Sequence, residues 1–419
     1  MSREVPEGWR LVRLGDLVAI ERAAMTMREI NRCEIVRLYS LPAFDHGAIP
    51  EGASGGTILS NKNLVPEDCI LFSKLNPRIP RVWRVRHQQQ ETALCSTEFW
   101  PLTPKTDNVD LDFLAIYLGS NAFLNSPEIT PASSTNSHQR VDRKSFEVFE
   151  LMLPTLAEQR RIANILSSID DAIASTQAVI EQTKKVKQAT LERLLTKGID
   201  HTRFKQTDIG GIPDSWIITT ADEICSQISV GIVIKPSRYY TDDGIRCFRS
   251  ANVREGFIED ADWVFITEEG NTVNRKSILK TGDVLVVRTG YPGTSCVVTP
   301  EFDGANCIDI IFARPDLTKV EPRFLSAFIN SESGKLQVLK AEGGLAQKHF
   351  NVGSMKVMKI PLPTIAEQRE IVRHIEDFTQ AENSLKKLLE QYKCMKSALM
   401  SDLLTGRKRV TDTLPLAAE

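Results

Sequence analysis

The chain lacks any apolar run approaching the ~20 residues that a membrane helix needs. Its first nine residues, Met1 to Trp9, contain no apolar core of the kind found in signal peptides. The hydrophobic content of 42% and the charged content of 25% are typical of a globular protein with buried cores. We therefore expect a cytoplasmic protein that does not enter a membrane.

Closely spaced cysteines are also missing. The eight cysteines are scattered along the chain, and no two of them form a C-x-x-C pair. Metal sites and disulfide scaffolds usually show closer spacing than this. We expect reduced thiols in the core and no metal site.

The chain carries little net charge. It contains 52 lysines and arginines against 54 aspartates and glutamates, a formal net charge of −2. This is not the composition of a strongly basic nucleic-acid-binding protein. Any electrostatic attraction to DNA therefore has to come from local patches.

Motifs of enzymes that act on DNA are absent or broken. A methyltransferase would need an N-P-P-[YF] motif, whereas Asn76-Pro77-Arg78-Ile79 lacks the second proline and the aromatic residue. A motor or nuclease would need G-x-x-x-x-G-K-[ST], whereas Gly334-Lys335 is followed by leucine. We expect no catalysis by this chain alone and no bound cofactor, although the acid–lysine patterns of nucleases are too short to exclude.

What the chain does contain is an internal repeat. The stretch Leu153-Pro-Thr-Leu-Ala-Glu-Gln-Arg-Arg-Ile162 recurs as Leu362-Pro-Thr-Ile-Ala-Glu-Gln-Arg-Glu-Ile371, 209 residues later. Upstream, Pro6-Glu-Gly-Trp9 corresponds to Pro213-Asp-Ser-Trp216. A repeat of this length indicates two copies of one structural plan.

Each copy reads as a β-rich, mixed domain followed by a long helix. Short β-type apolar runs such as 68–74 and 283–288 are entered through turn residues. We predict an α+β fold with a β-rich domain at 1–154, a helix at 155–200, a second β-rich domain at 201–363, a second helix at 364–410 and a tail at 411–419.

The repeated stretch predicts where each helix begins and ends. The proline ends a strand, and the threonine that follows it, Thr155 or Thr364, is a suitable N-cap with glutamate three residues later, the capping-box pattern. Glycine and basic residues near Gly198 and Gly406 suit the C-terminal ends. About 40 residues at 1.5 Å per residue give a helix of roughly 60 Å.

A helix of this length needs a partner to bury its apolar side chains, and the other copy is the obvious one. In the second helix, one seven-residue row is Ile371, Phe378, Leu385, Tyr392 and Leu399, and the row beside it is Ile375, Ala381, Leu388, Met395 and Leu403. The first helix carries Ile162, Ile169, Thr176, Thr183 and Thr190, flanked by Ile165, Val179, Ile180, Val186 and Leu194. We predict an antiparallel coiled coil with internal pseudo-two-fold symmetry.

Local positive charge suggests where DNA would bind. Between Cys69 and Gln90 the chain has five cations and no acid. The candidate DNA-binding residues are Lys74, Asn76, Arg78, Arg81, Arg84, Gln139 and Arg140 in the first half, and Arg288, Tyr291, Lys348 and His349 in the second. A basic strand pair that only faces solvent remains the alternative for this cluster.

The repeat resembles the specificity subunit of type I restriction-modification systems. The likeness rests on the doubled L-P-[TL]-x-x-E-Q-[RK]-x-I before a long helix, behind a domain that opens P-x-x-W, and it covers residues 1–410. The resemblance implies two target-recognition domains, each reading one half of a split sequence in double-stranded DNA, and a coiled coil that sets the distance between the halves.

The same resemblance implies partners. The helices would dock two methyltransferase subunits, to which restriction (motor) subunits attach, and S-adenosylmethionine, ATP and Mg would belong to those partners. By this likeness, the residues Glu158, Gln159, Arg160, Glu367, Gln368 and Arg369 are structural or subunit-docking residues rather than catalysts. A coiled-coil scaffold or adaptor that binds only proteins is the alternative, favoured slightly by the net charge of −2.

Overall fold

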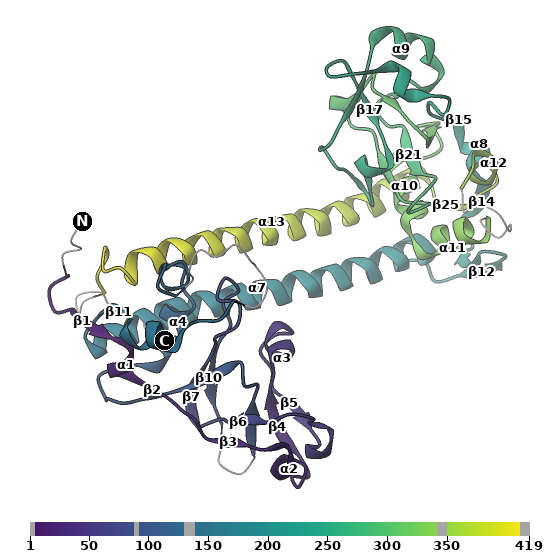
Figure 1. Cartoon of the computed structure of the whole chain (residues 1–419). Coiled ribbons are helices and arrows are strands. Elements are labelled where there is room, and N and C mark those ends of the chain that lie inside the picture. The colour runs from purple at the N-terminus through teal and green to yellow at the C-terminus, as the bar shows by residue number, and fades with distance from the viewer. Residues whose placement is uncertain (1–4, 88–91, 130–138, 342–349, 411–419) are drawn as a thin grey trace. The chain divides into compact units, whose positions relative to one another are not determined.

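The computed structural model describes residues 5–87, 92–129, 139–341 and 350–410, which fall into two compact units (Figure 1). Unit 1 consists of Met1–Gln177 and Leu388–Glu419, and unit 2 of Ala178–Lys387. Each unit combines β-sheets, short helices and part of both long helices, α7 (Leu156–Lys197) and α13 (Ile365–Leu403). The α+β class with two long helices is therefore confirmed. The compact units divide both helices near their middle, so the predicted domain limits stay a prediction.

The described residues of unit 1 form three sheets. Its strands are β1 (Arg10–Arg13), β2 (Val18–Ile20), β3 (Ala24–Met25), β4 (Val36–Tyr39), β5 (Glu51–Ala53), β6 (Lys62–Leu64), β7 (Asp68–Ser73), β8 (Val82–Arg86), β9 (Ala93–Cys95), β10 (Phe99–Pro104) and β11 (Glu150–Leu153). Its short helices are α1 (Leu14–Leu17), α2 (Met27–Ile30), α3 (Leu41–Asp45), α4 (Leu111–Leu118), α5 (Asn121–Leu124) and α6 (Arg143–Val148). The sheet orders are β1-β11, β2-β10-β7-β8 and β3-β6-β9-β4-β5.

Unit 2 repeats this plan. Its strands are β12 (Phe204–Thr207), β13 (Gly210–Pro213), β14 (Ile217–Thr220), β15 (Cys225–Val230), β16 (Tyr240–Thr241), β17 (Ile245–Phe248), β18 (Val253–Arg254), β19 (Phe257–Ile258), β20 (Val264–Ile266), β21 (Val284–Val287), β22 (Ser295–Val297), β23 (Asn306–Cys307), β24 (Ile310–Pro315) and β25 (Lys359–Leu362). Its short helices are α8 (Ala221–Ile224), α9 (Glu268–Val273), α10 (Pro322–Asn330), α11 (Glu332–Ala341) and α12 (Val352–Lys356).

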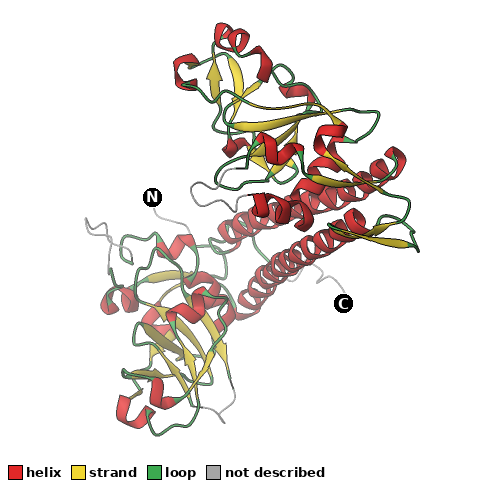
Figure 2. Ribbon diagram, turned by 90° about the vertical axis from the view of Figure 1, so that its right-hand side faces the viewer, coloured by secondary structure: helices red, strands yellow, loops and turns green. Residues whose placement is uncertain are grey.

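Two sheets of unit 1 have direct counterparts in unit 2, and the remaining sheet has a partial one. The four-stranded sheet β2-β10-β7-β8 of unit 1 matches β15-β24-β21-β22 of unit 2, and the pair β1-β11 matches β14-β25. The parallel pairing of β4 with β9 matches that of β17 with β23, which places Cys95 and Cys307 at equivalent positions. Strands make up much of both units, and the long helices run beside them (Figure 2). The internal repeat predicted from the sequence is confirmed.

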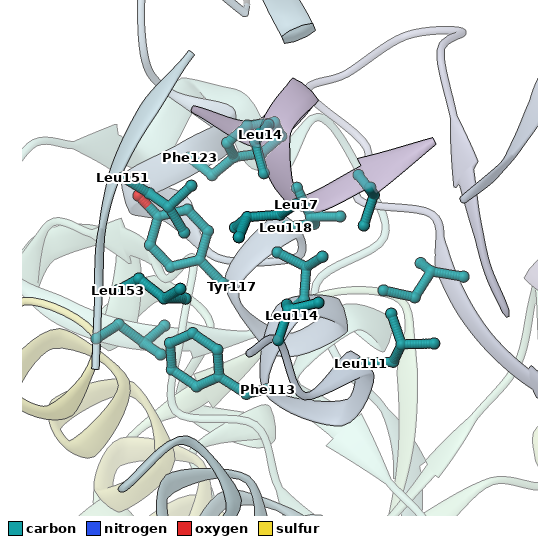
Figure 3. Close-up of a cluster of buried hydrophobic side chains, with 14 of the residues drawn as sticks. Leu14, Leu17, Leu111, Phe113, Leu114, Tyr117, Leu118, Phe123, Leu151 and Leu153 are labelled. Carbon is teal, nitrogen blue, oxygen red and sulfur yellow. The ribbon is translucent and has the colours of Figure 1, made fainter. Parts of the chain in front are cut away.

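A hydrophobic cluster joins each sheet to its short helices. In unit 1, the apolar face of α4 meets α1 and β11, and this is the region drawn in Figure 3. Asp110 caps α4 because its carboxylate accepts from the Phe113 N–H, and the helix then presents apolar residues on one side. Phe113, Leu114 and Leu118 are fully buried. The same cluster includes Ile162 and Leu166 of α7, so the long helix is anchored in the core of the unit.

The two long helices pack antiparallel within each unit. In unit 1, Leu399 and Leu403 of α13 join the cluster that contains Ile162 and Leu166 of α7. In unit 2, Leu194 of α7 joins the cluster that contains Ile371 of α13. The N-terminal part of α7 therefore packs against the C-terminal part of α13, and the C-terminal part of α7 packs against the N-terminal part of α13. The antiparallel coiled coil is confirmed.

The seam of this coiled coil differs from the predicted one in its second row. In α13 it consists of Ile371, Ile375, Phe378, Glu382, Leu385, Leu389, Tyr392, Lys396, Leu399 and Leu403, all buried or half-buried. In α7 it consists of Ile162, Leu166, Ile169, Ile173, Thr176, Ile180, Thr183, Lys187, Thr190 and Leu194. The predicted seam residues Ala381, Leu388, Met395, Val179 and Val186 are exposed instead.

The reason is that charged residues occupy seam positions and pair across it. Glu382 lies 3.5 Å from Lys187 in unit 2, and its side chain is only 12% exposed. Lys396 hydrogen-bonds to Asp170 in unit 1. Lys187 and Lys396 are equivalent residues of the repeat. Each of these equivalent lysines pairs with an acid of the other helix, although the two acids are not equivalent residues of the repeat.

Candidate nucleic-acid interface

In unit 1, the polar candidates gather at one end of the four-stranded sheet. Strand β7 leaves the sheet at Ser73, opposite Phe99 where β10 begins. The connection from β7 to β8 then pairs with a distant segment, because the Val141 N–H donates to the Lys74 carbonyl and the Asn76 N–H donates to the Gln139 carbonyl, both at 2.8 Å. The structure therefore brings Lys74, Asn76 and Gln139 together.

Arg140 is held at the same end of the sheet. Its guanidinium makes two hydrogen bonds, of 2.8 and 3.0 Å, to the Glu98 carboxylate, and these raise the pKa of Arg140 above its ordinary value. The Glu98 carbonyl in turn accepts from the Lys74 N–H at 3.0 Å. Asn76 has a φ of +50°, a left-handed conformation that asparagine tolerates better than most residues. Arg78 follows in the exposed part of the turn.

Arg81 and Arg84 occupy a different role. Arg81 makes two hydrogen bonds, of 2.7 and 2.8 Å, to the Asp45 carboxylate at the end of α3, and its side chain is 12% exposed. Arg84 donates to the Asp112 carboxylate at 2.8 Å and to the carbonyls of Cys69 and Val85. These guanidinium groups tie the hairpin to its own unit. Their donors are occupied by carboxylates and carbonyls of the chain, and DNA contact at both arginines stays a prediction.

In unit 2, the equivalent sheet end carries Arg288 and Tyr291. Strand β21 ends at Val287, and the Arg288 carbonyl accepts from the Phe350 N–H at 3.2 Å. The Arg288 guanidinium hydrogen-bonds to the Asp309 carboxylate, as Arg140 does to Glu98. Tyr291 is 83% exposed in the turn between β21 and β22. Lys348 and His349 lie outside the described residues.

In the repeated Glu-Gln-Arg motif, the glutamate and glutamine lie in the interior and the arginine lies on the surface. The threonine hydroxyls cap both long helices as predicted, with the Thr155 Oγ1 accepting from the Glu158 N–H at 3.3 Å. The glutamate, however, does not complete a capping box. The Glu158 carboxylate binds the Trp9 indole N–H at 2.9 Å, the Arg409 guanidinium at 2.8 and 2.9 Å and the Val410 N–H at 3.3 Å.

Unit 2 has a similar junction, in which His201 takes the place that Arg409 has in unit 1. The Glu367 carboxylate accepts from the Trp216 indole at 3.1 Å and from the Ile199 N–H at 3.1 Å, and lies 2.8 Å from His201 Nε2. Gly198 ends α7 here with a φ of +64°, and a Cβ at this position would lie 2.7 Å from the Trp216 ring. A residue without a side chain is therefore required both by the backbone and by the tryptophan.

The glutamines of the motif are buried and hydrogen-bonded to the backbone. Gln159 accepts from the Asp110 N–H at 2.8 Å and donates to the carbonyls of Asn108 and Pro154, each at 3.0 Å. Gln368 makes the equivalent bonds to Glu321, Lys319 and Pro363. Both side chains are fully buried. Each glutamine thus fixes the start of a long helix against the loop before α4 or α10.

The arginines of the motif face solvent. Arg160 is 65% exposed and lies 3.8 Å from Asp110, and Arg369 is 67% exposed and lies 4.0 Å from Glu321. The structural role predicted for the motif therefore describes the glutamate and the glutamine. The two arginines are the exposed members of the motif.

Sequence reasoning missed the partners of the glutamates. Trp9 and Trp216 mark the repeat in the sequence, but their indole groups bind carboxylates that follow them by about 150 residues. Arg409 looked like a generic basic residue at a helix end and is instead a specific partner of Glu158. The parallel spacing of tryptophan and glutamate in both halves was the one available signal for these contacts.

Other chemistry has little support in the described part of the chain. Burial raises the pKa of the Cys69 and Cys247 thiols to about 12, which leaves them protonated and unreactive. No group of three potential metal ligands occurs among the described residues. Gly52–Gly56 matches the nucleophile pattern G-x-S-x-G, but Ser54 precedes a three-residue 3-10 helix rather than the helix of a nucleophile elbow. Within the described ranges, no helix is both long and apolar enough to cross a membrane.

The chain is thus a protein of two related α+β units, each with polar and basic side chains at one end of its four-stranded sheet. The family described as the type I restriction modification DNA specificity domain matches residues 6–185 and 266–391. The chain belongs to this family. Its function is DNA sequence specificity, and catalysis lies with other subunits of such enzymes, as predicted.

Relatives agree over nearly the whole chain. The MjaVIII type I restriction enzyme specificity subunit of Methanocaldococcus jannaschii is 26% identical over 97% of this chain and 94% of its own length. The solved HsdS subunit from Thermoanaerobacter tengcongensis covers 97% of this chain and 99% of that chain, with 19% identity and a TM-score of 0.54. A chain from a solved type I restriction-modification system shares the fold with a TM-score of 0.65 and 18% identity, covering 97% of this chain and 100% of that chain.

Proposed function

We propose that the two equivalent sheet ends are the surfaces that read the two halves of a bipartite DNA target. The observation that supports this is the shared geometry of the sheet ends. In unit 1, Lys74, Asn76 and Gln139 meet beside the Arg140–Glu98 pair, and in unit 2, Arg288 pairs with Asp309 beside the exposed Tyr291. Side chains of this chemistry suit phosphate oxygens and base edges in the major groove.

The remaining parts of the proposal concern the partners. The two long helices dock two methyltransferase subunits, and restriction subunits attach through them. S-adenosylmethionine, ATP and Mg are bound by those partners and not by this chain, which works in the cytoplasm. The alternative of a scaffold that binds only proteins has less support, because the family carries DNA specificity.

Removing two candidate phosphate contacts is expected to weaken DNA binding. In the assembled methylase, Lys74→Ala with Arg78→Ala is expected to lower affinity for the methylated target by about tenfold to a hundredfold. It should also reduce the slope of log affinity against log salt by about two, since each phosphate contact contributes about 0.9. The target is first identified by mapping DNA methylation with and without the gene, and affinity is measured by fluorescence anisotropy at several salt concentrations.

The matched control for this variant is Arg13→Ala. Arg13 is also an exposed arginine of unit 1, but it lies on β1 beside Glu150, away from the sheet end. Its removal should leave affinity and salt slope unchanged. Equal affinity of the double variant and the wild type, with intact subunit assembly, would remove the sheet end of unit 1 as a DNA surface.

Reversing the charge of the exposed motif arginines is expected to disrupt assembly. Arg160→Glu with Arg369→Glu should abolish stable association with the methyltransferase subunit in size-exclusion chromatography, because two exposed cations become anions at the proposed docking surface. The unfolding temperature should change little, since both side chains are more than 60% exposed.

The repeat offers a matched control pair on the same helices. Lys184 and Lys393 are equivalent residues, 44% and 46% exposed, and each pairs with a glutamate of its own helix. Reversing both should leave assembly intact. Normal assembly of the Arg160/Arg369 variant would show that the motif arginines do not dock the methyltransferase.

A further inference from the structure

A second segment of unit 2 meets the sheet end that carries Arg288 and Tyr291. Strand β15 ends at Val230, opposite Ile311, and the chain then continues along the start of β24. The Ile232 N–H donates to the Cys307 carbonyl at 2.8 Å, and the Ile232 carbonyl accepts from the Asp309 N–H at 3.2 Å. Asp309 is the residue that binds the Arg288 guanidinium. The segment after Ile232 therefore begins beside the Arg288 turn.

This segment exposes large apolar side chains. Val233 is 50% exposed and Ile234 is 71% exposed, and Tyr291 in the neighbouring turn is 83% exposed. Ile234 lies two residues beyond Ile232, within about 7 Å along the chain. Exposed apolar side chains that occur singly need no explanation, but several of them at one end of a sheet mark a binding surface.

The backbone holds these side chains in place at an energetic cost. Lys235 has a φ of +44° and a ψ of +55°, a left-handed conformation that is uncommon for lysine. Pro236 follows it, and the Arg238 N–H donates to the Lys235 carbonyl at 3.2 Å. Strained conformations of this kind persist where the surrounding structure enforces them, often at ligand-binding sites.

The charge of the segment fits a polyanion. Between Ser229 and Thr241 the chain carries Lys235 and Arg238 and no acidic residue. Apolar side chains next to cations match the major groove of DNA, where the thymine methyl group is the apolar feature between two phosphate backbones. Since A·T and T·A pairs place this methyl group differently, contacts to it carry sequence information.

We propose that Val233, Ile234 and Tyr291 recognise thymine methyl groups in the half-site read by unit 2, with Lys235 contacting a flanking phosphate. The inference rests on the proposed function, since it assumes that this sheet end faces DNA. It adds the chemistry of recognition, and it predicts that this half-site contains thymine on at least one strand at a contacted position.

The test removes the methyl groups from the DNA. The assembled methylase is titrated with duplexes in which thymines of one half-site are replaced by deoxyuridine, which lacks only the methyl group. For the half-site of unit 2, each contacted thymine replaced should weaken binding about fourfold, the effect of burying one methyl group. The variant Val233→Ser with Ile234→Ser should bind the thymine duplex about tenfold more weakly and should discriminate less between thymine and uracil duplexes.

The controls separate this inference from the proposed function. Both substituted residues are at least half exposed, so the unfolding temperature should stay the same. In the half-site of unit 1, replacing thymine by uracil should change the affinity of the Val233→Ser/Ile234→Ser variant as much as it changes that of the wild type. If the Lys74/Arg78 variant loses affinity but uracil has no effect in the half-site of unit 2, the thymine inference fails while the proposed function stands.

Three other outcomes overturn the inference. The first is a unit 2 half-site without thymine on either strand. The second is a serine variant that discriminates thymine from uracil as the wild type does. The third is a serine variant that loses the methyltransferase subunit while keeping its DNA affinity, which would identify the apolar surface as a protein contact.

Discussion

Glu158→Ala is expected to destabilise unit 1 by about 2 kcal/mol, the effect of removing the charged acceptor of several hydrogen bonds in a partly buried junction. The Glu158 side chain is 5% exposed and joins Trp9, the start of α7 and the segment after α13. Without the carboxylate, the partly buried Arg409 guanidinium and the buried Trp9 indole lose their acceptor. Urea unfolding followed by circular dichroism measures the change.

The control for this variant is Glu150→Ala. Glu150 is 49% exposed on β11 and lies 3.6 Å from Arg13, so its removal should change stability by less than about 0.5 kcal/mol. An equal, small effect of both substitutions would show that the Glu158 junction does not stabilise the unit. Glu158→Gln tests the charge, because the amide retains the shape of the side chain.

The contacts of Glu158 also predict how the stability difference between the wild type and Glu158→Gln depends on pH. Burial of Glu158 favours its protonated form, but hydrogen bonds from Arg409 and Trp9 and the charge of Arg409 outweigh it, and they hold the pKa of this carboxyl below 4.5. A carboxyl with a lowered folded pKa stabilises the protein fully above its unfolded pKa, and that contribution is lost as the pH falls through the folded pKa. The stability advantage of wild type over Glu158→Gln should therefore be constant near neutral pH and shrink below about pH 4.5.

Lengthening both long helices by seven residues is expected to change the DNA target without changing its half-sites. Insertions after Gln177 in α7 and after Lys387 in α13 add two helical turns, or about 10 Å, and keep the seven-residue phase of the seam. DNA rises about 3.4 Å per base pair, so the spacer between half-sites should grow by up to about three base pairs. Each added base pair also rotates one half-site about the duplex axis relative to the other. We therefore expect the spacer to lengthen by about one to three base pairs.

Methylation mapping of cells that carry the lengthened protein measures the new spacer. The matched control inserts seven residues in α7 alone. This leaves the helices unequal and separates pairs such as Lys187 with Glu382 from those such as Asp170 with Lys396. The single insertion should abolish methylation. Methylation of the original target by the doubly lengthened protein would show that the helices do not set the spacing.

Local signals made part of the fold predictable. The proline, the N-cap threonine and the glycine after the helix act within a few residues of one another, and α7 begins at Leu156 and ends at Lys197 as these signals indicate. The internal repeat extended this reasoning to the second half. Doubling the same local pattern made the long helices and their pairing predictable as well.

Contacts between distant residues were not predictable in the same way. The carboxylate partners of Arg81 and Arg84, Asp45 and Asp112, lie 36 and 28 residues away in the sequence, so no local pattern predicted these pairs. The second row of the seam was assigned to Ala381, Leu388 and Met395 because they are apolar. The actual row includes Glu382, which pairs with Lys386 of its own helix and Lys187 of the other, and Lys396, which pairs with Asp170 of the other helix.

The seam charges have a consequence for the inheritance of new specificities. Lys187 belongs to the first copy of the repeat and Glu382 to the second, and Asp170 and Lys396 are likewise contributed by different copies. If recombination replaces one half of the gene with that of a relative, the incoming helix has to bring an acid opposite Lys187 or Lys396, or that lysine loses its partner in the other helix. The coiled coil therefore restricts which halves of two related genes can be combined. The ion pairs at the two sheet ends each lie within one half of the chain, so the sequences of the sheet ends can diverge independently.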